Sequence, residues 1–161
     1  MKVFKPLVAF LVLLIIVSML AGLLFPGPIS VLSYSPTFFL LVCFANALHF
    51  LEEDFTKAWE VEGQLRKNPD GTPKESLYDK AFFVTFSHSI VLLSFLFYIP
   101  IANGDPWALL FGLGISLNGI LNGLVHLGIL AKFRRNTGVV SGVFQLVFGS
   151  LVITSLFIPT V

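Results

Sequence analysis

Five long stretches without a charged side chain constrain the fold of this 161-residue chain more than any other feature. They are Leu7–Phe25, Thr37–Leu51, Ala81–Ile99, Trp107–Ala131 and Val139–Ile158. A helix needs about 20 apolar residues to cross a bilayer core, and the shorter second stretch can continue as helix into polar sequence beyond the bilayer edge. Only 12% of the residues are charged, against about 25% in soluble domains. The sequence therefore predicts an all-α, polytopic membrane helix bundle with five transmembrane helices.

The basic residues predict the orientation of these helices. All ten Lys and Arg lie before the first helix, between the second and third, or between the fourth and fifth. Five crossings place these three segments on one side of the membrane, and the segments on the other side contain no Lys or Arg. Because basic residues are retained on the cytoplasmic side, we expect the N-terminus inside and the C-terminus outside.

The length fits a single membrane domain over residues 1–161. Lys2 and Lys5 precede an apolar run, so residues 1–26 form either an N-terminal anchor helix or a signal peptide. The run Leu7–Phe25 exceeds the roughly 7–15 residues of a signal-peptide core, which favours the anchor. Cleavage would leave four helices, and the core over residues 37–161 would keep its orientation.

A His-x-x-Glu-Glu motif, His49-Phe50-Leu51-Glu52-Glu53, lies at the polar end of the second predicted helix. At 100° per residue, Asn46, His49 and Glu53 share an arc of about 60°, and Glu52 lies at its edge. Ionisable groups inside a membrane are costly and usually turn toward protein or water rather than lipid. This face of the second helix is therefore expected to point into the bundle.

The other helices carry polar residues at a similar depth. On the fourth predicted helix, Asn118, Asn122 and His126 recur every four residues, and the third carries His88. At 1.5 Å per residue, the three histidines lie roughly 5–15 Å below the basic side. This predicts a pocket open to the cytoplasm. The plain alternative is that these side chains only join helices together, as intramembrane polar residues often do.

Two further patterns concern loops and packing. Asn68-Pro69-Asp70-Gly71 predicts a turn, and Thr72-Pro73-Lys74-Glu75 has the pattern of a helix start, which would begin the third helix near Pro73. Small residues on the fourth predicted helix let a neighbouring backbone approach closely; they are Gly112, Ser116, Gly119 and Gly123.

The motif resembles the signature of the HXXEE-domain family of small prokaryotic integral membrane proteins. The block Asn118-x-x-x-Asn122-x-x-x-His126, followed by Arg134, Arg135 and Gly138, is similar to that family's second polar block. The resemblance covers roughly Thr37 to Val161, so Leu7–Phe25 looks like an addition. Where the family often has Pro-Gly after the basic residues, this chain has Asn136-Thr137-Gly138. The resemblance implies a protein of the prokaryotic inner membrane, with an enzymatic role but no defined reaction.

The residue types permit two kinds of chemistry. The candidate metal ligands are His49, Glu53, His88 and His126, and the candidate catalytic residues are Glu52, Glu53, Asn118 and Asn122. In the first mechanism the ligands bind a divalent metal, zinc or iron, for hydrolysis or oxidation of a lipid or other amphiphile. Glu52 or Glu53 would orient His49 or act as a general base. In the second, metal-free mechanism, Glu53 and His49 exchange protons with a lipid-soluble substrate that Asn118 and Asn122 orient.

Other function classes remain as alternatives. A non-catalytic lipid-binding or metal-binding role needs the same residues without turnover. A transporter needs access from both sides and often shows internal repeats, of which the sequence has none. The expected partners are the membrane and an amphiphilic small molecule, with oligomerisation open. The net charge of +1 gives no reason to expect nucleic acid.

Overall fold

The computed structural model describes residues 16, 20, 35–65, 68–72 and 80–155. These ranges contain helices and connections and no strand. The helices are α2 (Pro36–Thr56), α3 (Ala58–Leu65), α4 (Lys80–Ala102), α5 (Pro106–Phe133) and α6 (Val139–Ser155). The predicted all-α class is therefore confirmed for the described part of the chain.

The predicted helices can be followed one by one. The segment expected to form the first, Leu7–Phe25, lies almost entirely outside the described residues. The second predicted helix is α2, which continues through the motif to Thr56, and α3 follows it as a short separate helix. The third, fourth and fifth predicted helices correspond to α4, α5 and α6. Each observed boundary among the described residues lies within a few residues of the expected one, apart from this extension of α2.

Two of the described helices are long and apolar enough to cross a membrane. They span Val84–Ala102, with a mean hydropathy of 1.8, and Trp107–Phe133, with a mean hydropathy of 1.7. The apolar helix Val139–Ser155 is shorter, at 17 residues. The structure thus supports membrane-helix character in the described residues.

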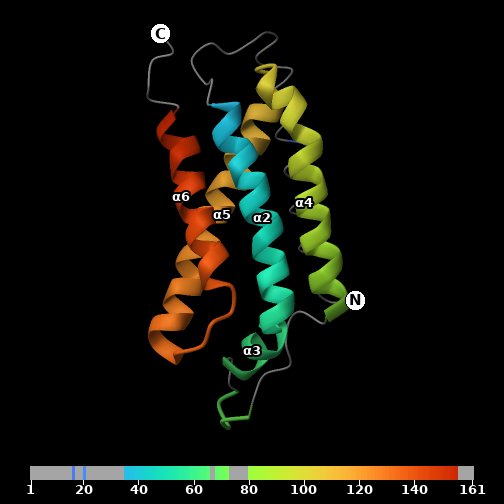
Figure 1. The fold of residues 1–161 in the computed structure, drawn as a ribbon. Helices are drawn as coiled ribbons and strands as arrows, with labels where there is room; N and C mark the ends of the chain where they lie inside the picture. Colours follow the sequence, from blue (N-terminus) through green and yellow to red (C-terminus); the bar gives the residue numbers. More distant parts are fainter. Residues whose placement is uncertain (1–15, 17–19, 21–34, 66–67, 73–79, 156–161) are drawn as a thin grey trace.

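Four helices, α2, α4, α5 and α6, run side by side as a bundle (Figure 1). The closest association is between α5 and α6, and α2 packs against both α6 and α4. The short helix α3 and the link between α5 and α6 lie at the same end of the bundle (Figure 1). We call this link, residues 134–138, the α5–α6 link.

An apolar core fills the opposite end of the bundle. Phe39 and Val42 of α2, Phe111 of α5 and Val152 of α6 are all buried there. The ring of Phe97 stacks on that of Phe111 with centroids 3.8 Å apart. Buried polar side chains lie toward the other end, where α2 ends and α6 begins; they include His49, Glu53, His126 and Ser141.

The helix ends have clear local causes. Pro36 and Pro106 stand in the first turn of α2 and α5, where a missing N–H costs no hydrogen bond. Lys57 and Arg134 have positive φ angles, 50° and 56°, at the ends of the same helices. A left-handed residue ends a helix, so these two positions separate α2 from α3 and α5 from the α5–α6 link.

Small residues allow α5 and α6 to approach closely. A Cβ atom on Gly142 would lie 3.4 Å from the Cα of Gly123, and one on Gly149 would lie 2.7 Å from the carbonyl oxygen of Ser116. A Cβ on Gly119 would contact the Cβ of Gln145 at 3.5 Å. The prediction that small residues on the fourth predicted helix, α5, allow a neighbouring backbone to approach closely is confirmed at Ser116, Gly119 and Gly123.

The predicted turn is present between α3 and α4. The amide of Gly71 donates to the carbonyl of Asn68 at 2.9 Å. The hydroxyl and amide of Thr72 both donate to the carboxylate of Asp70, and these hydrogen bonds hold the pKa of Asp70 below its usual value. The expected helix start near Pro73 falls on residues 73–79, outside the described residues, and α4 is described from Lys80.

Candidate functional site

His49 lies at the centre of a group of contacts at the end of α2. Its side chain is fully buried, with 0% exposed. Nδ1 lies 3.1 Å from the hydroxyl of Ser141. On the other edge of the ring, Nε2 lies 3.3 Å from Oε1 of Glu53 and 2.6 Å from the amide nitrogen of Asn122. Both ring nitrogens therefore have polar partners, as burial of an imidazole requires.

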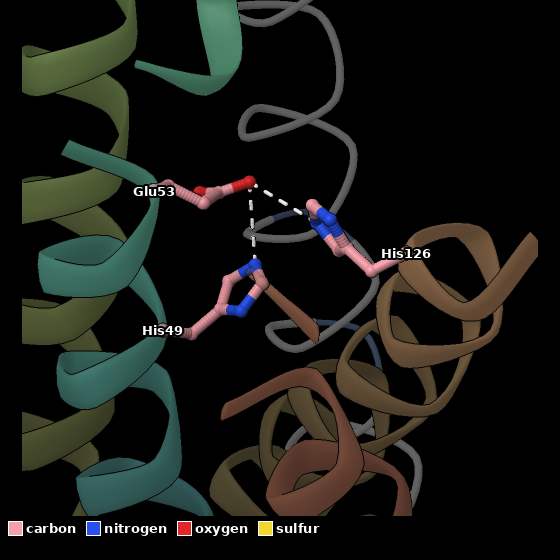
Figure 2. Close-up of side chains that lie close together, drawn as sticks. All are labelled: His49, Glu53 and His126. Carbon is pink, nitrogen blue, oxygen red and sulfur yellow. Dashed lines mark ion pairs between the residues drawn. The ribbon is translucent and has the colours of Figure 1, made fainter. Parts of the chain in front are cut away.

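Glu53 lies one helical turn beyond His49 and on the same face of α2. Its Oε1 is also 3.2 Å from Nε2 of His126, which belongs to α5. Figure 2 shows this carboxylate oxygen facing both imidazoles. We refer to His49, Glu53 and His126 as the His–Glu–His group.

His126 repeats the arrangement of His49. Its Nδ1 lies 2.9 Å from the hydroxyl of Thr137, and its Nε2 faces Glu53. The two imidazole rings meet edge to face, with centroids 4.7 Å apart. One donor atom from each member of the His–Glu–His group lies within 4.8 Å of the other two. Two imidazoles and a carboxylate at such separations could hold a metal ion.

Glu52 contacts the start of α6, whereas Glu53 contacts the two histidines. Its carboxylate accepts hydrogen bonds from the amide of Val140 at 3.2 Å and from the amide of Ser141 at 2.8 Å. These residues form the first turn of α6, whose free N–H groups and dipole favour a negative charge. The hydroxyl of Ser141 also donates to Glu52. Glu52 therefore reaches His49 only through Ser141 and caps α6 at the same time.

A row of three buried or half-buried amides leads from His49 into the bundle. The amide nitrogen of Asn122 lies 3.3 Å from Oε1 of Gln145, and Nε2 of Gln145 donates to Oδ1 of Asn46 at 2.8 Å. These three residues come from α5, α6 and α2. The amide nitrogen of Asn46 has no hydrogen-bond partner among the described residues. The row ties three helices together beside the His–Glu–His group.

The α5–α6 link covers the His–Glu–His group. Gly138 has a φ angle of +120°, and a Cβ atom there would lie 2.9 Å from Cε1 of His49 and 3.2 Å from Cγ of Glu53. Thr137 and Gly138 are both buried. The exposed fractions of Glu53 and His126 are only 7% and 5%. The expected pocket, open toward the basic side, is therefore closed by this link.

The structure does not bring His88 to the group. Its side chain is exposed, and its Nδ1 lies 2.7 Å from the carbonyl oxygen of Val84 on the same helix. The adjacent Ser87 is buried instead, so the inward face of α4 lies about 100° from His88. The direction of its side chain therefore gives no support to the prediction of His88 as a fourth ligand.

Asn118 also lies apart from the group, with an exposed side chain. Positions four residues apart advance by about 40° around a helix, so Asn118 and His126 differ by about 80°. Asn122 and His126 face α2 and α6, whereas Asn118 has turned out of that interface. The role predicted for Asn118 as an orienting residue therefore has no support from its position.

The sequence reasoning did not identify every residue of the site. The sequence patterns assigned no role to Ser141 or Gln145, and none pointed to Thr137. The signal that could have found Thr137 is its place two residues after the basic cluster and directly before a glycine. Residues that cover a site from a connecting loop have no helical period to reveal them.

Comparisons with known proteins give one match. No curated protein and no solved structure matches the chain. A family model described as proteins of unknown function with an HXXEE motif matches residues 40–153, which is more than half of the chain and includes α4, α5 and most of α2 and α6. The motif, the second polar block and Gly138 all lie within this range. The chain therefore belongs to the HXXEE family.

Proposed function

We propose that this chain is an integral membrane protein that binds a divalent metal ion through His49, Glu53 and His126. The metal, zinc or iron, would serve hydrolysis or oxidation of a lipid or other amphiphile. The observation that carries the proposal is that the two histidines make the same pair of contacts. Each turns Nε2 toward the same carboxylate oxygen of Glu53 and holds Nδ1 against a hydroxyl.

The exposed surface of the bundle supports the membrane part of the proposal. Leu92, Leu96 and Ile99 form one face of α4, with exposed fractions of 61%, 61% and 68%. Soluble proteins rarely leave large continuous apolar faces in water, whereas lipid covers such faces at no cost. Five membrane crossings, with the basic end of the bundle in the cytoplasm of a prokaryotic cell, complete the proposed topology.

The distances within the group support a metal. Nitrogen and oxygen ligands about 2.0–2.1 Å from a tetrahedral zinc ion lie about 3.3 Å from one another. The two distances from Glu53 Oε1 to the imidazoles are 3.3 and 3.2 Å. Direct charge-assisted hydrogen bonds are shorter, about 2.7–2.9 Å. Both distances from Glu53 thus match those between neighbouring ligands of one cation, and the donor atoms of all three residues lie within 4.8 Å of one another.

The partners of Nδ1 also support a metal. A metal-bound histidine usually donates its other ring N–H to a fixed oxygen, which sets the ring orientation and the tautomer. Here Ser141 and Thr137 provide those oxygens. With the proton on Nδ1, each Nε2 keeps its lone pair for the metal. Ser141 in turn donates to Glu52, so the carboxylate would strengthen His49 as a ligand through this hydroxyl.

Asn122 fits this assignment when its amide oxygen faces the group. In the structure the amide nitrogen lies 2.6 Å from Nε2 of His49, and an N–H donated there would occupy the single lone pair that the metal needs. Reversal of the amide, which exchanges its nitrogen and oxygen, frees that lone pair and adds an oxygen to the set of donor atoms. Gln145 and Asn46 can reverse with it because each amide contacts the next.

The chemistry follows from the donor set. A divalent metal held by two imidazoles and one carboxylate can polarise water or a carbonyl group, or take part in oxidation if it is iron. The residues of this chain would supply the ligands, fix the imidazole tautomers and exclude bulk water beneath the α5–α6 link. Opening of that link would admit the polar end of an amphiphile.

Element analysis of the purified full-length chain tests the metal. The protein is prepared in mild detergent without chelator, together with His49→Ala, His126→Ala and His88→Ala. Wild type and His88→Ala should carry zinc or iron near one equivalent, and the other two variants should lose it. His88 is the matched control because it is the third histidine and lies outside the group. Wild type free of metal, or equal loss in all three variants, would contradict the proposal.

The second candidate is metal-free acid–base catalysis by Glu53 and His49. The observation that favours it is that one carboxylate oxygen is shared by two imidazoles, which can hold a proton between them. Activity of metal-free wild type on a lipid substrate, abolished in Glu53→Gln, would support this candidate over the first.

A further inference from the structure

Three basic side chains stand beside the cover of the His–Glu–His group. Lys132 lies in the last turn of α5, and Arg134 and Arg135 begin the α5–α6 link; all three are exposed. We call Lys132–Arg135 the basic segment. The amino group of Lys132 lies over the ring of Phe133, 5.2 Å from its centroid. Within the described part of the chain, none of the three basic side chains forms an ion pair with an acid.

Lys57, a basic residue at the same end whose side chain is also described, has an acidic partner among the described residues. Lys57 lies 3.8 Å from the carboxylate of Glu60. Near the basic segment, Glu52 is already engaged by the first turn of α6 and the hydroxyl of Ser141. Among the described residues, no acid pairs with the charges of the basic segment, which can therefore attract an external anion.

The basic segment is joined directly to the residues that cover the site. Two residues after Arg135 comes Thr137, whose hydroxyl contacts His126, and then Gly138, where an added Cβ atom would lie within 3.4 Å of all three members of the His–Glu–His group. Arg134 is held in a left-handed conformation at the end of α5, with its amide bonded to the carbonyl of Leu130. An anion bound by the two arginines would therefore lie next to the cover of the site.

We propose that the basic segment binds the phosphate of an anionic phospholipid, and that the substrate of the site is an amphiphile with such a phosphate head. This proposal rests on the proposed function for its reaction and for its membrane setting. Guanidinium groups match phosphate oxygens in geometry, and basic residues beside a membrane helix attract anionic headgroups. The exposed side chains of Leu130 and Phe133, 36% and 40% exposed, offer apolar contacts to the acyl chains.

Orientation of the helices alone would also place basic residues here. The two explanations differ in what they require. The orientation of the helices depends on the total number of basic residues on one side of the membrane, so replacing any two of them should have a similar effect. Headgroup binding depends on Arg134 and Arg135 in particular and not on Lys57, which has an acidic partner.

Lipid retention in nanodiscs tests the proposal. The full-length protein is placed in discs of phosphatidylcholine with a minority of phosphatidylglycerol, and bound lipids are counted by native mass spectrometry. Wild type should retain phosphatidylglycerol in preference to phosphatidylcholine. The double variant Arg134→Gln, Arg135→Gln should lose this preference by roughly ten- to thirty-fold, since each basic residue near the headgroups contributes about a factor of five. Lys57→Gln should keep it.

Two further measurements keep the result decisive. Metal content reports whether the double variant is folded around its site, and it separates failure of this proposal from failure of the metal proposal. Addition of millimolar inorganic phosphate asks whether a free anion suffices. Equal preference for phosphatidylglycerol in wild type and the double variant, equal loss in Lys57→Gln, or full displacement by inorganic phosphate would each overturn lipid binding at the basic segment.

Discussion

The imidazole rings of His49 and His126 meet edge to face, with centroids 4.7 Å apart and planes inclined by 70°, although the residues belong to different helices. Each ring is held from behind by a hydroxyl, and the space in front of both is closed by Glu53 and Gly138. The arrangement thus depends on α2, α5, α6 and the α5–α6 link together.

Replacement of Gly138 should disturb the site directly. Gly138→Ala would place a Cβ atom against His49 and Glu53 at a φ angle of +120°. The strain alone should cost about 1–3 kcal/mol of the free energy of unfolding, and the clash should also lower metal content. Gly71→Ala is the control, because Gly71 has a φ angle of +84° and no atom within 4 Å of its Cβ position. Equal loss in both variants, measured by denaturant unfolding in mild detergent, would contradict the packing role of Gly138.

Glu52 should matter for the start of α6. Glu52→Ala removes the acceptor of the amides of Val140 and Ser141, so we expect a loss of about 0.5–2 kcal/mol in stability, as for other lost helix caps. Hydrogen exchange at these two amides should accelerate. Glu60→Ala, which removes an exposed acid near the same end, should leave both measurements nearly unchanged.

The hydroxyl of Ser141 should tune the metal ligand. Ser141→Ala removes the oxygen beside Nδ1 of His49, and loss of such a supporting partner typically costs 10–100-fold in metal affinity. Competition with a chromogenic zinc chelator measures this change. Ser150→Ala alters an exposed serine on the same helix and should leave the affinity as in wild type. Unchanged affinity in Ser141→Ala would argue against orientation of His49 by this hydroxyl.

The amide row should contribute to stability through Asn122. Asn122→Ala would leave Oε1 of Gln145 without its donor, and an unsatisfied buried polar group costs about 1–3 kcal/mol. Asn118→Ala, one turn earlier on α5, changes an exposed side chain and should shift the free energy of unfolding by about 0.5 kcal/mol or less. Similar effects in the two variants would mean that the row adds no stability.

The membrane orientation can be tested with reporter fusions. A reporter active only outside the cytoplasm should be active when fused after Val161 and inactive when inserted near Asp70. The reason is that all ten Lys and Arg can lie on the same side of the membrane as Asp70, and basic residues are retained on the cytoplasmic side. The reverse pattern would place the His–Glu–His group near the outer face.

Helical periodicity predicted one half of the site well. His49 and Glu53 are four residues apart, so any helix through them puts both on one face, and the structure buries both. The same arithmetic placed Asn122 and His126 together. It failed for Asn118, because a spacing of four drifts by about 40° at each step, and after two steps the residue has left the interface.

The sequence by itself determined the all-α class, the helix boundaries within a few residues and the faces of α2 and α5 that carry the polar groups, because composition and periodicity are local properties of the chain. Only the tertiary structure decided which residues meet across helices. The depth of a residue along a helix does not reveal how the helix is rotated about its axis. The sequence pattern therefore could not show that His126 faces the bundle interior and His88 does not. The contacts of Thr137 and Gly138 depend on how the α5–α6 link turns back over the bundle, and that path follows from the close packing of α5 on α6 rather than from any local signal.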